Sequence, residues 1–157
     1  MKSVKVLVVD DSAFMRKLIA DLLSEDERIQ VIGTARNGEE GLRKIKELNP
    51  DAVTMDVEMP VLNGLEALKI IMKTMPVPVV MLSSTTKEGT ENTFTAMEYG
   101  AVDFIAKPSG PISLDLHKIK TELTDKVVQA SKANMKGLVN FSGSGKKLPD
   151  FTGVIVK

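Results

Sequence analysis

Four charged side chains stand where short apolar segments of the sequence end: Asp10, Asp11, Asp56 and Lys107. Apolar segments of this length are typical of buried β-strands. The carboxyl ends of parallel strands meet at one edge of a sheet, where such sheets bind ligands, so we expect the four side chains to converge. The site would be net negative, and neighbouring carboxylates repel by roughly 4 kcal/mol at about 4 Å in an effective dielectric near 20. The pattern therefore predicts a bound cation.

The aspartates suit two kinds of chemistry. Carboxylate oxygens are ligands that magnesium prefers, so Asp10, Asp11 and Asp56 fit a Mg²⁺ site. A carboxylate can also attack phosphorus and form an aspartyl phosphate. The simpler explanation is that Asp10 and Asp11 cap a helix and that Asp56 only ends a strand. A shared site is favoured, because the simpler explanation needs the same coincidence at three separate segments.

Five apolar segments alternate with helical patterns over the first 130 residues or so. Their near-continuous apolar character is typical of parallel strands that are buried on both faces. We therefore predict an α/β fold, specifically a flavodoxin-like (βα)5 doubly wound parallel sheet with strand order 2-1-3-4-5. This order places the first and third strands side by side, so that their aspartates meet. The predicted strands are Val4–Val9, Ile29–Ala35, Ala52–Met55, Val77–Leu82 and Val102–Ala106.

The helical patterns carry apolar residues at spacings of three and four, which predicts the face that each helix turns toward the core. The fourth helix is more polar than the others. Its candidate core-facing residues are Phe94 and Met97, with Thr93 as a further one. The other predicted core positions are Phe14, Leu18, Ile19, Leu22, Leu23, Leu42, Ile45, Leu48, Leu65, Leu68, Ile71, Met72, Ile112, Leu116, Ile119, Leu123, Val127 and Ala130.

Composition limits the classes of function. Lysine plus arginine (21) equals aspartate plus glutamate (21), and no basic run occurs, which argues against nucleic-acid binding. The sequence has no cysteine and a single histidine, His117, so it offers no disulfide and no zinc cluster. No stretch approaches the roughly 18 apolar residues that a bilayer span requires. We expect a cytoplasmic protein without membrane insertion.

The helical periodicity fades near Ala133. Residues 134–153 contain Ser142-Gly143-Ser144-Gly145, a composition typical of a flexible interdomain linker. This segment does not match the nucleophile pattern G-x-S-x-G. We predict a domain over residues 1–133 and, at residues 154–157, the first strand of a further domain that the sequence does not contain.

These motifs together resemble the receiver domains of two-component response regulators, over about residues 1 to 130. The resemblance implies that Asp56 accepts a phosphoryl group from a phosphohistidine of a sensor kinase. It also implies that Asp10, Asp11, Asp56 and the backbone carbonyl of Glu58 hold Mg²⁺. The motifs that carry it are Asp10-Asp11, Met55-Asp56-Val57-Glu58-Met59-Pro60, Gly64, Ser83-Ser84 and Lys107-Pro108.

The same resemblance assigns roles to three further side chains. Lys107 would contact the phosphoryl group, aimed by a cis peptide bond to Pro108. Ser83 falls at the position of the switch hydroxyl, which turns to the phosphoryl oxygen, and Phe104 falls at the coupled aromatic position. The simpler alternatives are a surface lysine, a strand-terminal serine and a core phenylalanine.

A narrower resemblance covers Val79 to Gly110, which is similar to the receiver of the chemotaxis protein-glutamate methylesterase. It implies that a chemotaxis-type histidine kinase is the phosphodonor and that the partner is the protein's own C-terminal esterase domain, whose active site the unphosphorylated receiver covers. The full-length protein would then be a hydrolase acting on chemoreceptors. The present chain, which lacks that catalytic domain, would only gain and lose its own phosphoryl group.

Other classes remain open from the residues alone. The receiver could belong to a DNA-binding response regulator, stand alone, or be an interaction module with inert acids. A haloacid-dehalogenase-type phosphatase also uses magnesium and an aspartyl phosphate, but it needs Asp-x-Asp after its first strand, where this sequence has the adjacent pair Asp10-Asp11. No phosphate-binding G-x-G-x-x-G or G-x-x-x-x-G-K-[ST] motif follows the first strand.

Overall fold

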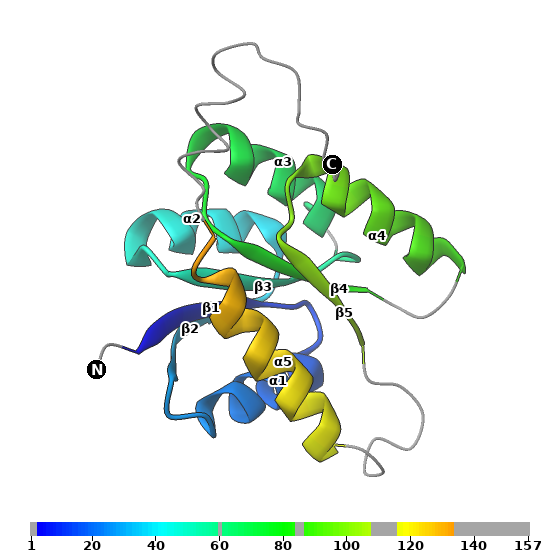
Figure 1. The fold of residues 1–157 in the computed structure, drawn as a ribbon. Helices are drawn as coiled ribbons and strands as arrows, with labels where there is room; N and C mark the ends of the chain where they lie inside the picture. The colour runs from blue at the N-terminus through cyan, green and yellow to red at the C-terminus, as the bar shows by residue number, and fades with distance from the viewer. Residues whose placement is uncertain (1–2, 60, 84–86, 108–115, 134–157) are drawn as a thin grey trace.

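The structure is a computed structural model that describes residues 3–59, 61–83, 87–107 and 116–133. In this part of the chain five strands alternate with five helices (Figure 1). The elements are β1 (Val4–Val9), α1 (Ala13–Ser24), β2 (Ile29–Ala35), α2 (Gly38–Leu48), β3 (Ala52–Asp56), α3 (Gly64–Thr74), β4 (Val79–Ser83), α4 (Lys87–Tyr99), β5 (Asp103–Ala106) and α5 (Leu116–Ala130). The predictions for Pro108, Ile112, the linker 134–153 and the strand at 154–157 lie outside the described residues.

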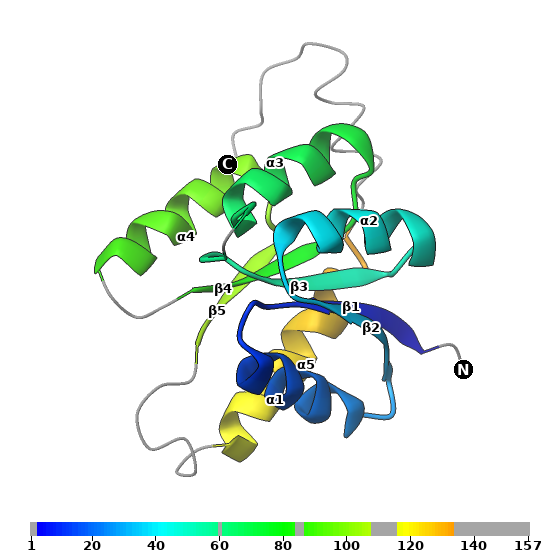
Figure 2. The same cartoon turned by 180° about the vertical axis from the view of Figure 1, so that it is seen from behind.

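The strands form one parallel sheet in the order β2-β1-β3-β4-β5. The predicted fold class and strand order are therefore confirmed. Helices α2, α3 and α4 cover one face of the sheet, and α1 and α5 cover the other (Figures 1 and 2). Because β1 pairs directly with β3, the loops after these two strands lie next to each other. This adjacency positions the candidate site.

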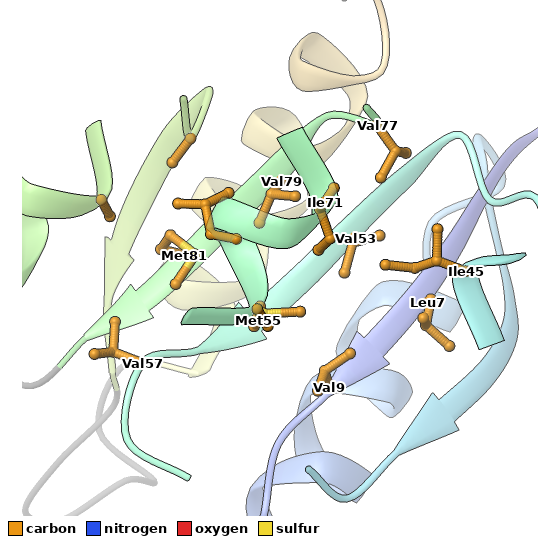
Figure 3. Packing of buried hydrophobic residues seen from close by; sticks show 14 of the residues in the cluster. Leu7, Val9, Ile45, Val53, Met55, Val57, Ile71, Val77, Val79 and Met81 are labelled. Atoms are coloured by element: carbon orange, nitrogen blue, oxygen red, sulfur yellow. The ribbon is translucent and has the colours of Figure 1, made fainter. Parts of the chain in front are cut away.

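Both faces of the sheet are buried, which explains why the strand sequences do not alternate between polar and apolar residues. Alternate residues of β1, β3 and β4 pack toward α2 and α3, as Val9, Met55 and Met81 do (Figure 3). The residues between them pack toward α1 and α5, as Val8 and Val80 do. The central strands are thus held from both sides by apolar contacts, and their carboxyl ends are fixed in space.

The predicted helix faces were wrong at four positions. Phe14 (61% exposed), Leu48 (38%), Phe94 (69%) and Met97 (40%) are not core residues. Among residues 91–99 of α4 the buried residues are Thr93 and Ala96, which are three apart, so the large side chains one position further along point away from the sheet. Apolar size is therefore a poor guide to the face of α4.

Local sequence sets the boundaries of several elements. Ser12, Asn37 and Asn63 cap α1, α2 and α3, each accepting the backbone N–H three residues further on. Strand β4 begins at Val79, later than the predicted start, because Pro78 has no N–H to give to a ladder. Every helix in the described ranges is too short or too polar to cross a lipid bilayer.

Candidate functional site

Three carboxylates meet where β1 and β3 end. Asp10 and Asp11 follow β1, and Asp56 is the last residue of β3. Each offers one oxygen, and these three oxygens lie within 4.8 Å of one another. Asp10 and Asp56 are buried, whereas Asp11 is exposed. The predicted convergence of the aspartates is therefore present in the structure.

Lys107 brings the fourth charged group into this cluster. It directly follows β5, and its backbone N–H donates to the carbonyl of Ser83 at 2.8 Å, which aligns the ends of β4 and β5. Its Nζ lies 2.8 Å from Oδ1 of Asp56 and forms an ion pair with it. Lys107 is thus not a plain surface lysine, because its ammonium group faces a buried carboxylate.

The helix-cap explanation for the acidic pair is wrong. The side chain that caps α1 belongs to Ser12, which accepts from the backbone N–H of Met15 at 3.2 Å. Asp10 instead accepts the N–H of Ser12 on Oδ1 at 2.9 Å, and its backbone carbonyl accepts from Nη1 of Arg16 at 2.9 Å. These bonds orient the Asp10 carboxylate so that its other oxygen stays available at the cluster.

Two buried carboxylate oxygens at the site have no partner, Oδ2 of Asp10 and Oδ2 of Asp56, and Oδ1 of Asp56 has only the ion pair with Lys107. Burial raises the pKa of Asp56 to about 6 against the ion pair with Lys107, and the carboxylate of Asp10 raises it further. Burial also raises the pKa of Asp10, although the Ser12 amide opposes the shift. Unsatisfied hard oxygens with raised pKa values are the donor set that a divalent cation would satisfy, so the residues fit magnesium.

The ammonium group responds in the complementary direction. Burial alone lowers the pKa of Lys107, but the neighbouring Asp56 outweighs burial, so the net pKa lies above its ordinary value. Lys107 therefore stays a cation throughout the neutral range. This single positive charge does not balance the several carboxylates of the cluster.

A hollow of about 430 Å³ opens beside the cluster, between the loops that follow β1 and β3. Glu58, whose backbone carbonyl was predicted as a ligand, lies on its wall and its side chain is exposed. Of the acidic cluster, Asp11 borders the hollow. Its lining residues are Asp11, Val57, Glu58, Met59, Asn63, Leu65 and Asn92.

The loop between β3 and α3 is fixed at both ends. The N–H of Gly64 donates to the carbonyl of Val57 at 2.7 Å, and the N–H of Gly38 donates to the carbonyl of Leu62 at 3.2 Å. A Cβ on Gly38 would overlap that Leu62 oxygen, so α2 and the loop approach as closely as only glycine allows. Val61, in this loop, adopts a φ of 70°, a strained conformation for a β-branched residue.

The two predicted switch residues differ in their surroundings. Ser83 is buried, and its Oγ lies 2.9 Å from Oγ1 of Thr93 on α4. Phe104 is 39% exposed, and Nζ of Lys126 lies 5.3 Å from the centroid of its ring, so it is not a core phenylalanine. The switch roles of Ser83 and Phe104 stay predictions.

Sequence reasoning missed three residues that shape the site: Arg16, Asn92 and the bond partner Thr93. Arg16 holds the Asp10 carbonyl from the first turns of α1, and Asn92 reaches the hollow from α4. None belongs to a chemical motif. Arg16 lies six residues after Asp10, which precedes α1, and such a separation identifies no contact in the sequence.

A family model for the response regulator receiver domain matches residues 6–118. The chain belongs to this family. The receiver domain resembles the solved response regulator domain of CheB from Thermotoga maritima at 49% sequence identity and a TM-score of 0.77, covering 85% of this chain and 99% of that one. The recognised family and the flavodoxin-like fold are thus both confirmed.

Two relatives place the receiver domain more narrowly. It is 69% identical over 138 residues to a protein-glutamate methylesterase/protein-glutamine glutaminase of Geobacillus kaustophilus, covering 88% of this chain and 40% of the relative. It is 59% identical over 127 residues to the protein of the same name in Bacillus subtilis, covering 81% of this chain and 36% of the relative. The chain therefore spans well under half the length of these relatives, and it is similar to the receiver of a chemotaxis response regulator.

Proposed function

We propose that Asp56 is the phosphoacceptor of this receiver domain, that Mg²⁺ assists it, and that the donor is a phosphohistidine on a chemotaxis-type histidine kinase. The observation that carries the proposal is the buried Asp56 carboxylate, which lies within 4.8 Å of two other carboxylates and 2.8 Å from Lys107. A buried carboxylate whose pKa is raised, among other carboxylates and beside a single cation, is typical of a functional site.

Asp10, Asp11, Asp56 and the backbone carbonyl of Glu58 would hold the magnesium ion. The donor set is hard oxygen, and Oδ2 of Asp10 and Oδ2 of Asp56 are buried without a hydrogen bond. When bound, the ion supplies positive charge that neutralises the phosphoryl oxygens. The ordering of Asp10 by Ser12, described above, keeps one of these ligands in place.

The reaction at Asp56 is a transfer of one phosphoryl group. An oxygen of the carboxylate attacks phosphorus, an O–P bond forms, and the P–N bond to the donor histidine breaks with its electron pair going to the imidazole. Lys107 lies within ion-pair distance and would bind an oxygen of the transferred group as a point charge. With a pKa of about 6, Asp56 is mostly ionised at neutral pH and available as the nucleophile.

The proposed setting is a larger chemotaxis regulator. Residues 1–133 form the receiver, 134–153 link it to an effector, and 154–157 begin the protein's own C-terminal esterase domain. Phosphorylation would relieve inhibition of that domain, which would demethylate chemoreceptors in the cytoplasm. The support is the similarity to two protein-glutamate methylesterases at 69% and 59% identity. Nucleic acid is not among the proposed partners.

A small acyl phosphate and Mg²⁺ test the phosphoacceptor directly. Wild-type protein incubated with acetyl phosphate should gain the mass of one phosphoryl group, and the adduct should map to Asp56. Asp56→Asn should abolish it. Asp51→Asn is the matched control, because Asp51 is an exposed aspartate just before the same strand. An unmodified wild-type mass, or an adduct that persists in Asp56→Asn, contradicts the proposal.

The same protein separates a receiver from a phosphatase. Incubation with a generic phosphate ester such as p-nitrophenyl phosphate should give no multiple turnover, because the nucleophile follows β3 rather than β1. Sustained release of p-nitrophenol that depends on Asp56 would favour the haloacid-dehalogenase alternative instead.

A further inference from the structure

The hydroxyl of Ser83 is engaged by a residue of α4. Ser83 ends β4, and its Oγ lies 2.9 Å from Oγ1 of Thr93, with both side chains buried. Along β4, Ser83 alternates with Leu82, which packs on the α1 and α5 side, so Ser83 points to the opposite face. The hydroxyl pair therefore joins the carboxyl edge of the sheet to the middle of a helix on that face.

The same hydroxyl is not directed to Asp56. Neither carboxylate oxygen of Asp56 accepts a hydrogen bond in the structure. A serine hydroxyl has a single proton to donate, and the oxygens of a phosphoryl group are strong acceptors. In the contact with Thr93 either hydroxyl can be the donor. For Ser83 to bond a phosphoryl group on Asp56 it must donate its proton there, so a bond in which Ser83 donates to Thr93 is lost.

We propose that Thr93 is a positioning residue of the phosphoacceptor site: it holds the Ser83 hydroxyl on the α4 side and thereby opposes the phosphorylated arrangement. The inference rests on the proposed function and deepens it by naming a residue that regulates the same site. Losing one buried neutral hydrogen bond shifts an equilibrium by about threefold to tenfold. Thr93 is therefore expected to disfavour the phosphorylated arrangement by about this factor.

The bond also makes α4 sensitive to the state of Asp56. When Ser83 donates to the phosphoryl group instead, the contact that joins β4 to α4 is weakened, and α4 is held less firmly against the end of the sheet. Such coupling is reciprocal, so anything that moves α4 outward would favour the phosphoryl group on Asp56. Thr93 is then the contact at which the two events are linked.

The chain provides a matched control on the same helix. Thr95 lies two residues after Thr93, and its Oγ1 donates to the carbonyl of Glu91 at 3.1 Å on the exposed side of α4. Replacing either threonine by valine removes a hydroxyl without changing the shape of the side chain. Only the change at position 93 removes a bond to the site.

The experiment titrates wild type, Thr93→Val, Thr93→Ser and Thr95→Val with fluoroberyllate in saturating Mg²⁺, followed by calorimetry. Fluoroberyllate is a tetrahedral, phosphoryl-like probe that binds at equilibrium. Thr93→Val should bind it about threefold to tenfold more tightly than wild type. Thr93→Ser, which keeps the hydroxyl, and Thr95→Val should stay within about twofold of wild type. In a Ser83→Ala background, Thr93→Val should have no further effect, because the bond is already gone.

Unchanged or weaker binding by Thr93→Val, or an effect that persists in the Ser83→Ala background, overturns the inference. Amide hydrogen exchange in the wild type is a second measurement that needs no variant: exchange at Ala96 and Met97 should rise with the probe, and unchanged exchange contradicts the link to α4. If wild type neither binds the probe nor takes a phosphoryl group from acetyl phosphate, the proposed function itself fails. Normal binding by wild type with no response at position 93 refutes only the role of Thr93.

Discussion

Two aspartates at the opposite ends of β3 show how differently one side chain can be used. Asp51, just before the strand, is exposed, and its Oδ2 accepts the backbone N–H of Lys5 at 2.9 Å. Asp56, at the other end, is 1% exposed, and its oxygens accept no backbone hydrogen bond and have only the ion pair with Lys107. The hydrogen bond of Asp51 stabilises the fold, whereas the burial of the Asp56 carboxylate destabilises it. A residue that destabilises the fold at one end of a strand is therefore a sign of a functional site there.

The largest expected effect compares the two aspartates by the same substitution. The folded-state pKa of Asp56, about 6, lies above the ordinary value of 3.8, so its contribution to stability is full below 3.8 and is lost as the pH rises through 6. Without metal at about pH 7.5, Asp56→Asn should therefore raise the unfolding free energy, by on the order of 3 kcal/mol. Asp51→Asn should change it by less than about 0.5 kcal/mol.

Urea unfolding in EDTA measures both variants. The advantage of Asp56→Asn over wild type should shrink toward zero at about pH 4, because the carboxyl is then protonated in the folded state. A destabilised Asp56→Asn at neutral pH, or a gap that does not depend on pH, would show that burial of Asp56 carries no such cost.

Magnesium binding should offset the destabilisation caused by the buried Asp56 carboxylate and should have no such effect at Asp51. At 100 times its dissociation constant, a ligand that binds only the folded state raises the unfolding free energy by about 2.7 kcal/mol. This gain is expected in wild type and Asp51→Asn and should be absent in Asp56→Asn. It should also weaken as the pH falls through about 6, because protons then compete for Asp56. Thermal unfolding with and without MgCl₂ checks it, and an equal gain in all three proteins would place the metal elsewhere.

The smallest effect concerns Thr54, which lies between the two aspartates. Its buried Oγ1 has no hydrogen-bond partner, yet it is not part of the acidic cluster. Thr54→Val should raise the unfolding free energy by about 1 kcal/mol, with or without magnesium. Thr124→Val is the control, because Oγ1 of Thr124 donates to the carbonyl of Lys120 at 2.9 Å and its loss should destabilise. A gain at Thr54 that requires magnesium would tie this hydroxyl to the site.

The sheet and the meeting of the carboxylates were predictable because each rests on a simple periodic rule. Near-continuous apolar strands indicate parallel pairing, and the order of such strands brings Asp10 beside Asp56. The buried face of α4 was not predictable in this way. There the packing selects Thr93 and Ala96 over the larger Phe94 and Met97, and a pattern that scores apolar size points to the wrong side.

The bond between Ser83 and Thr93 could not be found from sequence for a related reason. Ten positions separate the two residues, and their contact depends on how α4 lies across β4. Lys107 was predicted at the site from its place after a strand, but the 2.8 Å approach to Asp56 depends on the alignment of β4 with β5. Sequence patterns give the edge of the sheet at which residues gather, and packing gives their pairings.

The pleat of β4 has a consequence for how information leaves this molecule. Val79, Met81 and Ser83 share one side of the strand, so whatever happens at residue 83 is transmitted to the layer that contains α4. A slip of one residue in the pairing of β4 would point that position toward α1 and α5 instead, and the same chemistry at Asp56 would then address the opposite surface. Whether a residue occupies an odd or an even position along β4 therefore decides which face of the sheet receives the signal.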